Sequence, residues 1–137
     1  MSVFYWGGAS IYRMKGVNPL LIECATRALH KSKYDMSIPW LGGARTAEEQ
    51  NNIFKEGNSK CDGYKIKSDH QSGNALDIIP VIKGYKNIRA MNHFARLMLW
   101  EWQIIISEGK AEGYIMEWGG TYGSNSWDRP HYGIKKV

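Results

Sequence analysis

A histidine and an aspartate within one short segment are the first candidates for chemistry. His70 and Asp77 lie in the stretch SDHQSGNALD, residues 68–77, with six residues between them. Gly73 allows the chain to turn between the two. Such a turn would bring an imidazole from a loop and a carboxylate from the start of a strand to one ion. The pair is therefore a candidate for two ligands of a metal site.

A second histidine, preceded by a carboxylate, lies near the C-terminus in the sequence Asp128-Arg129-Pro130-His131. Pro130 restricts Arg129 to an extended conformation and so stiffens the approach to the histidine. A catalytic zinc takes three protein ligands and keeps a fourth position for water. We expect His131 as the third ligand. Asp128 would be the base that accepts a proton from a water whose pKa zinc lowers toward about 7.

Each of these residues also has an ordinary structural interpretation. A histidine in a loop is usually a polar surface group, and Asp77 alone can cap an element or pair with a lysine. The chain contains neither an H-E-x-x-H helix nor a C-x-x-C pair, so spacing alone leaves these interpretations open beside the metal site. His30 and His93 fall within predicted helices, where we expect structural roles.

Three predicted helices would support these segments. Asn18 followed by Pro19 is typical of a helix start and predicts a helix as far as Lys31. Thr46 with Glu49 matches a capping box for a helix to about residue 55. The longest helix is predicted over residues 87–107, where apolar side chains recur every three or four positions: Ile88, Met91, Ala95, Met98, Trp102 and Ile105.

Strands are predicted at residues 36–40, 75–82 and 114–118 and from His131 onward. The polar stretch 58–72 is predicted to be a loop, and loops of this length within a compact domain are often functional. Helices followed by strands mixed with one long helix favour an α+β fold with a small, mainly antiparallel sheet. We expect one domain spanning residues 1–137.

Composition excludes several classes of protein. The 137 residues are 43% hydrophobic and 23% charged, which is typical of a globular protein rather than a disordered one. The strongly apolar stretch at residues 98–106 is too short to cross a bilayer, so we expect no stable membrane insertion. Residues 1–12 lack the pattern of a secretory signal, which predicts synthesis in the cytoplasm. Cys24 and Cys61 are expected to be free thiols.

The net charge of +5 favours anionic partners: nucleic acid, an acidic membrane surface, or bacterial wall polymers. The lysines and arginines are scattered rather than gathered in a stripe, which gives nucleic-acid binding little support. The six tryptophans are a second feature of nucleic-acid binders, but core packing explains most of them, as for Trp102. We therefore expect no nucleic-acid partner.

Residues 68–77 match the signature S-x-H-x-x-G-x-A-x-D at every fixed position. This signature belongs to VanY-like zinc D-alanyl-D-alanine carboxypeptidases and the related L-alanyl-D-glutamate endopeptidases, many of them phage endolysins. Residues 43–46 with Gln50 resemble the family segment G-x-R-T-x-x-x-Q, and residues 118–120 and 130–132 resemble its W-G-G and P-H-F elements. The resemblance runs in order from about Val17 to Tyr132, and it implies a Hedgehog/DD-peptidase-like fold.

The resemblance implies a role for each matching residue. Zinc would be held by His70, Asp77 and His131, with Asp128 as general base. Arg45 would hold or polarise the substrate, because a guanidinium stays charged and can grip a carboxylate or oxyanion through two parallel donors. Gln50 and Ser68 are expected to contact the substrate as well. The alternative for Arg45 is an ion pair that stabilises the fold.

The acid at position 128 indicates a branch of the family. Carboxypeptidases and dipeptidases of the group usually have Glu three residues before the last histidine, whereas the L-alanyl-D-glutamate branch has Asp, as here. The chain departs from the family where many relatives have W-G-G-D-W, because Thr121 and Tyr122 follow its two glycines. Glu117, just before this motif, is a rival base. Residues 123–126 are expected only to lengthen the loop.

These features together predict a zinc metallopeptidase that cleaves the peptide stem of bacterial peptidoglycan between L-alanine and D-glutamate. As a phage or prophage endolysin, it would be a monomer without a separate wall-binding domain. It would accumulate in the host cytoplasm until a pore-forming, holin-type partner releases it to the wall. A wall-remodelling enzyme encoded by the cell remains an alternative origin. Alternative functions are a D-alanyl-D-alanine carboxypeptidase and a non-enzymatic zinc or wall-binding module.

Overall fold

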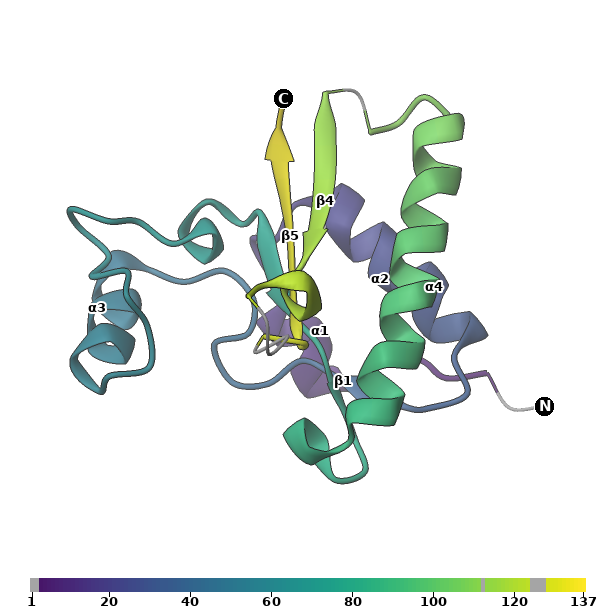
Figure 1. Cartoon of the computed structure of the whole chain (residues 1–137), viewed down its shortest axis with the longest axis horizontal. Coiled ribbons are helices and arrows are strands. Elements are labelled where there is room, and N and C mark those ends of the chain that lie inside the picture. The colour runs from purple at the N-terminus through teal and green to yellow at the C-terminus, as the bar shows by residue number, and fades with distance from the viewer. Residues whose placement is uncertain (1–2, 112, 124–127) are drawn as a thin grey trace.

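Helices and two small antiparallel sheets make up the computed structural model, which describes residues 3–111, 113–123 and 128–137. Figure 1 shows their arrangement. The elements are α1 (Gly8–Arg13), α2 (Pro19–Lys31), β1 (Met36–Ser37), α3 (Ala47–Lys55), η1 (Asp69–Ser72), β2 (Ala75–Asp77), β3 (Ile79–Pro80), η2 (Gly84–Lys86), α4 (Ile88–Ser107), β4 (Tyr114–Trp118), η3 (Gly119–Thr121) and β5 (His131–Lys136), where η marks a 3₁₀ helix. This is the α+β class with antiparallel sheets that the sequence predicts.

The larger sheet has three strands in the order β2-β5-β4, and both pairings are antiparallel. β1 and β3 form a separate antiparallel pair. In the larger sheet, Leu76 pairs with Tyr132 and Asp77 pairs with His131. The register of β2 against β5 therefore brings together two residues that are far apart in the sequence.

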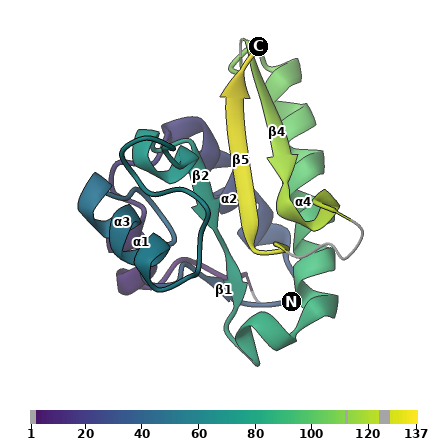
Figure 2. The same ribbon diagram turned by 60° about the vertical axis from the view of Figure 1, so that its left-hand side comes forward.

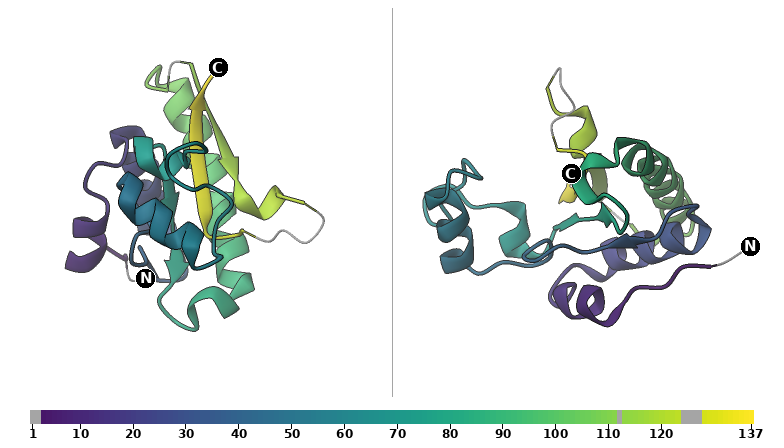
Figure 3. Two further views of the ribbon diagram at one scale, coloured as in Figure 1. Left: turned by 90° about the vertical axis from the view of Figure 1, so that its left-hand side faces the viewer. Right: turned by 90° about the horizontal axis from the view of Figure 1, so that it is seen from below.

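The hydrophobic core lies where α2 and α4 pack on the larger sheet (Figure 2). α3 lies at the far side of the sheet from α4, as the view from below in Figure 3 shows. The largest fully buried apolar side chains come from both helices, from the sheet and from residues 36–38 and 78: Tyr132, Phe94, Leu21, Leu29, Met36, Ile38, Leu76, Ile78, Met98, Ile105 and Ile134. The core thus supports β2 and β5 from the face opposite α3.

The helix starts agree with the capping signals. The Asn18 side chain accepts a hydrogen bond from the Leu20 N–H at the start of α2. Thr46 and Glu49 form both hydrogen bonds of a capping box at the start of α3. All three predicted helices are confirmed, two from their start signals and α4 from its apolar periodicity.

The strands predicted at residues 114–118 and from His131 onward are confirmed as β4 and β5, but the other two predicted strands were too long. The strand predicted at residues 36–40 ends at Ser37, because residues 39–42 form a turn in which the Gly42 N–H donates to the Pro39 carbonyl. The stretch 75–82 is divided between β2 and β3, which belong to different sheets. Between them, the Ile78 N–H donates to the carbonyl of Pro130.

Three further details differ from expectation. α1 was not predicted. Ile88, placed on the apolar face of the long helix, is 47% exposed because it lies in the first turn of α4. Of the tryptophans assigned mainly to the core, Trp102 is buried, but Trp40 and Trp100 are 68% and 64% exposed. The core explanation is therefore wrong for these two.

Two buried polar groups lie beside the core. Cys24 is free, as predicted, and its thiol donates a hydrogen bond to the Met98 carbonyl. Because burial raises the pKa of this thiol to about 12, Cys24 is inert. Cys61 is free as well. The Glu101 carboxylate is buried within α4, and both of its oxygens lie 2.9 Å from Lys31 Nζ.

Among the described residues, no helix combines the length and apolar character needed to cross a membrane.

Candidate active site

Asp77 lies between two imidazoles. Its Oδ1 is 3.2 Å from His131 Nδ1 and 3.4 Å from His70 Nε2. The cross-strand pairing of Asp77 with His131 places the first of these contacts. The structure therefore brings together all three predicted metal ligands, and among the described residues they form the one histidine and carboxylate cluster compact enough for an ion.

His70 is fixed by the 3₁₀ helix η1. The Ser68 hydroxyl accepts the His70 backbone N–H and caps this helix, and Gln71 completes the capping box. Gly73 ends it at φ +78°, a left-handed conformation that favours glycine. A Cβ on Gly73 would also collide with the Gly16 carbonyl. These constraints explain why the motif has serine and glycine on either side of the histidine.

The segment 42–45 connects both ligand-bearing elements. The Gly42 carbonyl accepts the Asp77 N–H at 2.8 Å, and the Arg45 N–H donates to the His70 carbonyl at 3.0 Å. The Gly43 carbonyl lies 2.9 Å from His70 Nδ1 and accepts its N–H, which leaves Nε2 of that ring free to bind an ion. The segment therefore sets both the position and the tautomer of His70.

The donor set fits zinc. Two histidine nitrogens and one carboxylate oxygen form a typical catalytic zinc set, and the three ligand atoms lie within 4.8 Å of one another. With ligand bonds of about 2.0–2.2 Å, the ligands of a tetrahedral ion are about 3.3–3.5 Å apart. The observed separations of 3.2 and 3.4 Å between Asp77 Oδ1 and the two imidazoles agree with this spacing.

Arg45 lies beside the metal ligands. Its Nε donates to the Leu41 carbonyl at 2.7 Å and its Nη1 to Gln50 Oε1 at 3.0 Å. Its Nη2 lies 3.5 Å from Asp77 Oδ2, the carboxylate oxygen turned away from the imidazoles. The ion pair considered as an alternative for Arg45 thus exists, and its partner is a metal-ligand candidate. Such an outer contact orients the ligand.

Gln50 occupies a different place from the one expected of a substrate contact. Its side chain is completely buried, and its Nε2 donates to Ser59 Oγ and the Cys61 carbonyl. Because its Oε1 accepts a hydrogen bond from Arg45 Nη1, Gln50 holds the guanidinium in place. The structure therefore makes Gln50 a positioning residue for Arg45.

Asp128 is held in place by the W-G-G segment. The Trp118 indole N–H donates to the Arg129 carbonyl at 2.7 Å. A Cβ on Gly119 would collide with the Asp128 carbonyl, so only glycine allows this close approach. The Asp128 carbonyl in turn accepts the His131 N–H at 3.1 Å. These contacts fix the turn that carries Asp128 next to the last ligand.

Burial and charge act against each other in this site. Burial would raise the pKa of Asp77, but hydrogen bonds from His131 and His70 outweigh it and hold that pKa well below its usual range. Burial and the charge of Asp77 raise the pKa of Asp128, against the opposing effect of His131. Burial would lower the pKa of His131, but its hydrogen bond to Asp77 raises it. Asp77 is thus a fixed negative charge that attracts cations, and Asp128 binds a proton more readily than an exposed aspartate.

A cavity of about 240 Å³ opens onto these groups. Its lining contains most of the residues predicted from the sequence, together with Asn58 and Ser59 from the long polar loop: Arg45, Asn58, Ser59, Ser68, His70, Asp77, Asp128 and His131. Sequence reasoning did not single out Asn58 or Ser59, although the loop length marked their segment as functional. Tyr122 was also missed as a neighbour of the site, and its ring centre lies 6.0 Å from that of His131.

Other candidates lie elsewhere. Glu117, the rival base, does not line this cavity and forms an ion pair with Lys135 at 2.6 Å. His93 Nε2 accepts the Lys33 N–H, and the His30 ring lies 5.0 Å from that of Tyr5. Of the predicted loop extension at residues 123–126, residues 124–126 lie outside the described part of the chain.

Comparison with known proteins identifies the family of this chain. The family model of the phage L-alanyl-D-glutamate peptidases matches residues 1–132. The chain belongs to this family. Its fold is similar to that of the Serratia marcescens L-Ala D-Glu endopeptidase ChiX, with a TM-score of 0.75 and 22% sequence identity over 96% of this chain and 90% of that one. A search among curated protein sequences finds no match. The family assignment makes this protein a peptidoglycan-cleaving L-alanyl-D-glutamate endopeptidase of the endolysin type.

Proposed function

We propose that this endopeptidase is zinc-dependent and that His70, Asp77 and His131 hold the ion. The observation that carries the proposal is the position of Asp128, whose side chain lines the same cavity as the three ligand candidates. A purely structural zinc site has a closed set of four protein ligands, and the described residues offer three. This favours an enzyme over a zinc-containing binding module.

Asp128 is the proton carrier in the proposed mechanism. Zinc, when bound, supplies Lewis-acid polarisation of the scissile carbonyl and lowers the pKa of water. The Asp128 carboxylate takes a proton from the attacking water as the water oxygen bonds to the carbonyl carbon of L-alanine. It then gives that proton to the nitrogen of D-glutamate as the C–N bond breaks. Its partly buried position suits both halves of this transfer.

Arg45 orients the stem in the proposed mechanism. Leu41 and Gln50 hold its Nε and Nη1, so the guanidinium has a fixed place in the cavity wall. A held guanidinium can stabilise a substrate carboxylate or developing oxyanion without reorganising. Ser68 lines the cavity too, but its hydroxyl already caps η1, so we assign it mainly to positioning His70.

Arg45→Lys is expected to lower kcat/KM by about 100-fold at saturating zinc. A lysine ammonium cannot keep the contacts of the guanidinium with Leu41, Gln50 and Asp77. Misplacement of a substrate group by such a change reduces the rate by about this factor. The measurement is steady-state cleavage of a defined stem peptide, with zinc affinity measured in parallel. Arg27→Lys is the matched control, since Arg27 pairs with Glu108 on the surface. An unchanged kcat/KM in Arg45→Lys would contradict the role given to Arg45.

Product analysis on a defined stem peptide tests the bond. We expect a new amino terminus on D-glutamate and no free D-alanine. Release of D-alanine would instead indicate the carboxypeptidase alternative, which uses the same chemistry on a different bond. Absence of any cleavage with zinc bound would favour the binding-module alternative.

The biological setting is part of the proposal. Peptidoglycan is the expected partner, and the net charge of +5 supplies a general attraction to anionic wall polymers. We propose that the chain acts as one catalytic domain and as a monomer. We also propose that it remains in the host cytoplasm until a holin-type pore releases it. The family supports this setting through its phage origin.

A further inference from the structure

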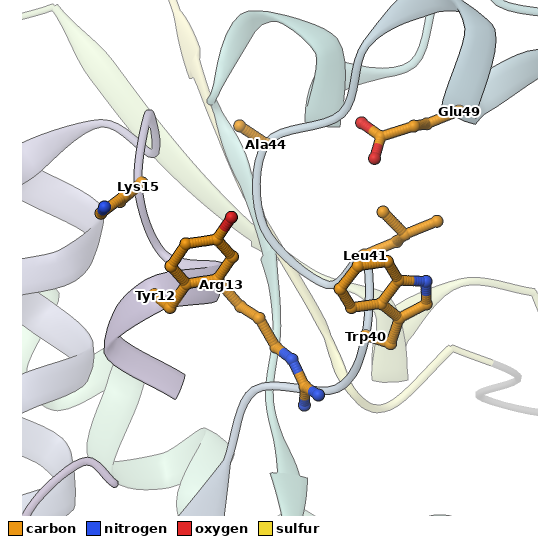
Figure 4. A pocket seen from close by; sticks show the side chains of 7 residues that line it. All are labelled: Tyr12, Arg13, Lys15, Trp40, Leu41, Ala44 and Glu49. Carbon is orange, nitrogen blue, oxygen red and sulfur yellow. The ribbon is translucent and has the colours of Figure 1, made fainter. Parts of the chain in front are cut away.

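A second cavity lies on the other side of the segment that carries Arg45. It has a volume of about 230 Å³ and is lined by residues from the end of α1 and just after it, from the segment 40–44 and from α3: Tyr12, Arg13, Lys15, Trp40, Leu41, Ala44 and Glu49. Figure 4 shows the Tyr12 ring on one side, Trp40 and Leu41 on the other, and the Glu49 carboxylate facing the space from α3. None of these residues lines the first cavity, although the Leu41 carbonyl accepts a hydrogen bond from Arg45 Nε.

The turn at residues 39–42 presents Trp40 to solvent at a conformational cost. Leu41 has φ +58°, a left-handed conformation that leucine rarely adopts. A hydrogen bond from the Gly42 N–H to the Pro39 carbonyl closes the turn, and Trp40 at its tip is 68% exposed. Tyr12 across the cavity is 63% exposed. Two large aromatic side chains therefore remain open to solvent around one hollow, an arrangement found at ligand-binding grooves.

Charged side chains of both signs, Arg13, Lys15 and Glu49, line this cavity. The Arg13 guanidinium lies 5.7 Å from the Trp40 ring centre, and its Nη1 donates to the Ile38 carbonyl. Lys15 Nζ lies 4.9 Å from the Tyr12 ring centre. Glu49 adds a carboxylate acceptor on the α3 side of the same cavity. Aromatic faces with both a donor and an acceptor at the edge suit a sugar, whose ring has apolar C–H faces and a rim of hydroxyl and amide groups.

The two cavities share a wall. Leu41 lines the second cavity, and its carbonyl accepts Arg45 Nε, which belongs to the first. Glu49 and Gln50 are neighbours on α3. Glu49 lines the second cavity, and Gln50 accepts a hydrogen bond from Arg45. Gly43 packs so closely on α1 that a Cβ there would collide with the Arg13 carbonyl. A ligand in the second cavity would therefore contact the same chain segment that holds Arg45 in the first.

We propose that this second cavity is a saccharide subsite for the amino sugar that carries the peptide stem. This inference rests on the proposed function. In peptidoglycan, the L-alanine of the stem is joined through a lactyl group to an amino sugar of the glycan strand. Because an extended residue spans about 3.3–3.6 Å, that sugar lies within about 10 Å of the scissile carbonyl. The volume is below the range of about 300–1,000 Å³ typical of drug-sized ligands, so it suits one sugar ring.

The test compares two substrates with the same stem. One stem carries the N-acetylglucosamine–N-acetylmuramic acid disaccharide, and the other carries only a lactyl group on L-alanine. We expect wild type to favour the disaccharide-linked stem on the order of tenfold in KM, the size of one aromatic stacking contact. Trp40→Ala should bring this KM ratio close to one. Trp100→Ala, which removes a tryptophan of similar exposure from α4, should leave the ratio unchanged.

A ratio near one in wild type, or an undiminished ratio in Trp40→Ala, would overturn the subsite. A binding measurement keeps this outcome separate from failure of the proposed function. The Trp40 indole N–H signal in NMR should shift on titration with the disaccharide, whether or not any stem is cleaved. A shift produced by poly(glycerol phosphate) but not by the disaccharide would contradict the saccharide assignment and indicate an anionic wall polymer.

Discussion

Asp128→Asn is expected to reduce turnover by about 10²–10⁴-fold, the usual contribution of a general base. Asparagine has nearly the same shape as aspartate but cannot take a proton from water. The turn should be preserved, because it is held by backbone groups: the Asp128 carbonyl accepts the His131 N–H, and the Arg129 carbonyl accepts the Trp118 indole. Zinc affinity should therefore stay close to that of wild type. Single-turnover cleavage and a zinc titration measure the two quantities.

Glu117→Gln is the matched control for this variant. Glu117 was the rival base from the sequence, but it pairs with Lys135 on the sheet and does not line the cavity. We expect it to retain most of the activity. Full activity in Asp128→Asn, or loss of activity in Glu117→Gln with the fold intact, would contradict the assignment of the base.

Asp77→Asn is expected to abolish zinc binding at micromolar concentrations, and activity with it. Loss of an outer partner of a metal ligand costs about 10–100-fold in affinity, and loss of the charged ligand itself should cost more. The amide can still hydrogen bond to the two imidazoles, so the fold should survive. A thermal readout is independent of activity, because an ion that binds the folded state raises the melting temperature of wild type. This rise should be absent in Asp77→Asn.

Asp69→Asn is the control for the metal-site variant. Asp69 lies in the same ten-residue motif and is exposed, but it is not part of the ligand cluster. It should keep both the zinc-induced rise in melting temperature and the activity. If Asp77→Asn were stabilised by zinc as strongly as wild type, the proposed ligand set would be wrong.

Local signals in the sequence predicted the three longest helices and two of the three candidate metal ligands. The capping box at Thr46 and the cap at Asn18 act within a few residues, so the sequence alone indicates them. The same holds for the segment from Ser68 to Asp77, because the serine cap and the left-handed Gly73 shape it locally. The candidate ligands His70 and Asp77 could therefore be found without knowledge of the tertiary structure.

Long-range pairing could not be derived in this way. The register that places Asp77 opposite His131 joins positions 54 residues apart. The need of a zinc site for a third ligand and the resemblance to a family indicated that the two residues meet, but no local signal predicted the strand pairing. The division of residues 75–82 into two strands depends on the hydrogen bond from Ile78 to Pro130, which is equally remote. The burial of Gln50 beneath Arg45 likewise depends on the polar loop that folds over α3.

The exposure of Trp40 has a different origin. Composition favoured burial for a tryptophan, but the turn at residues 39–42 holds this side chain outside the core, with Leu41 in a strained conformation. Strain of this kind persists where surrounding structure fixes it, often at functional sites. A departure from the sequence-based expectation thus led to the proposed sugar subsite.

Release of new amino termini from purified peptidoglycan, with and without a metal chelator, tests the central claim most directly. The account predicts that D-glutamate amines appear, disappear with chelator and return when zinc is added back. This result would establish the bond and the metal dependence together. Release that persists in chelator, or a freed amine on a residue other than D-glutamate, would contradict the account.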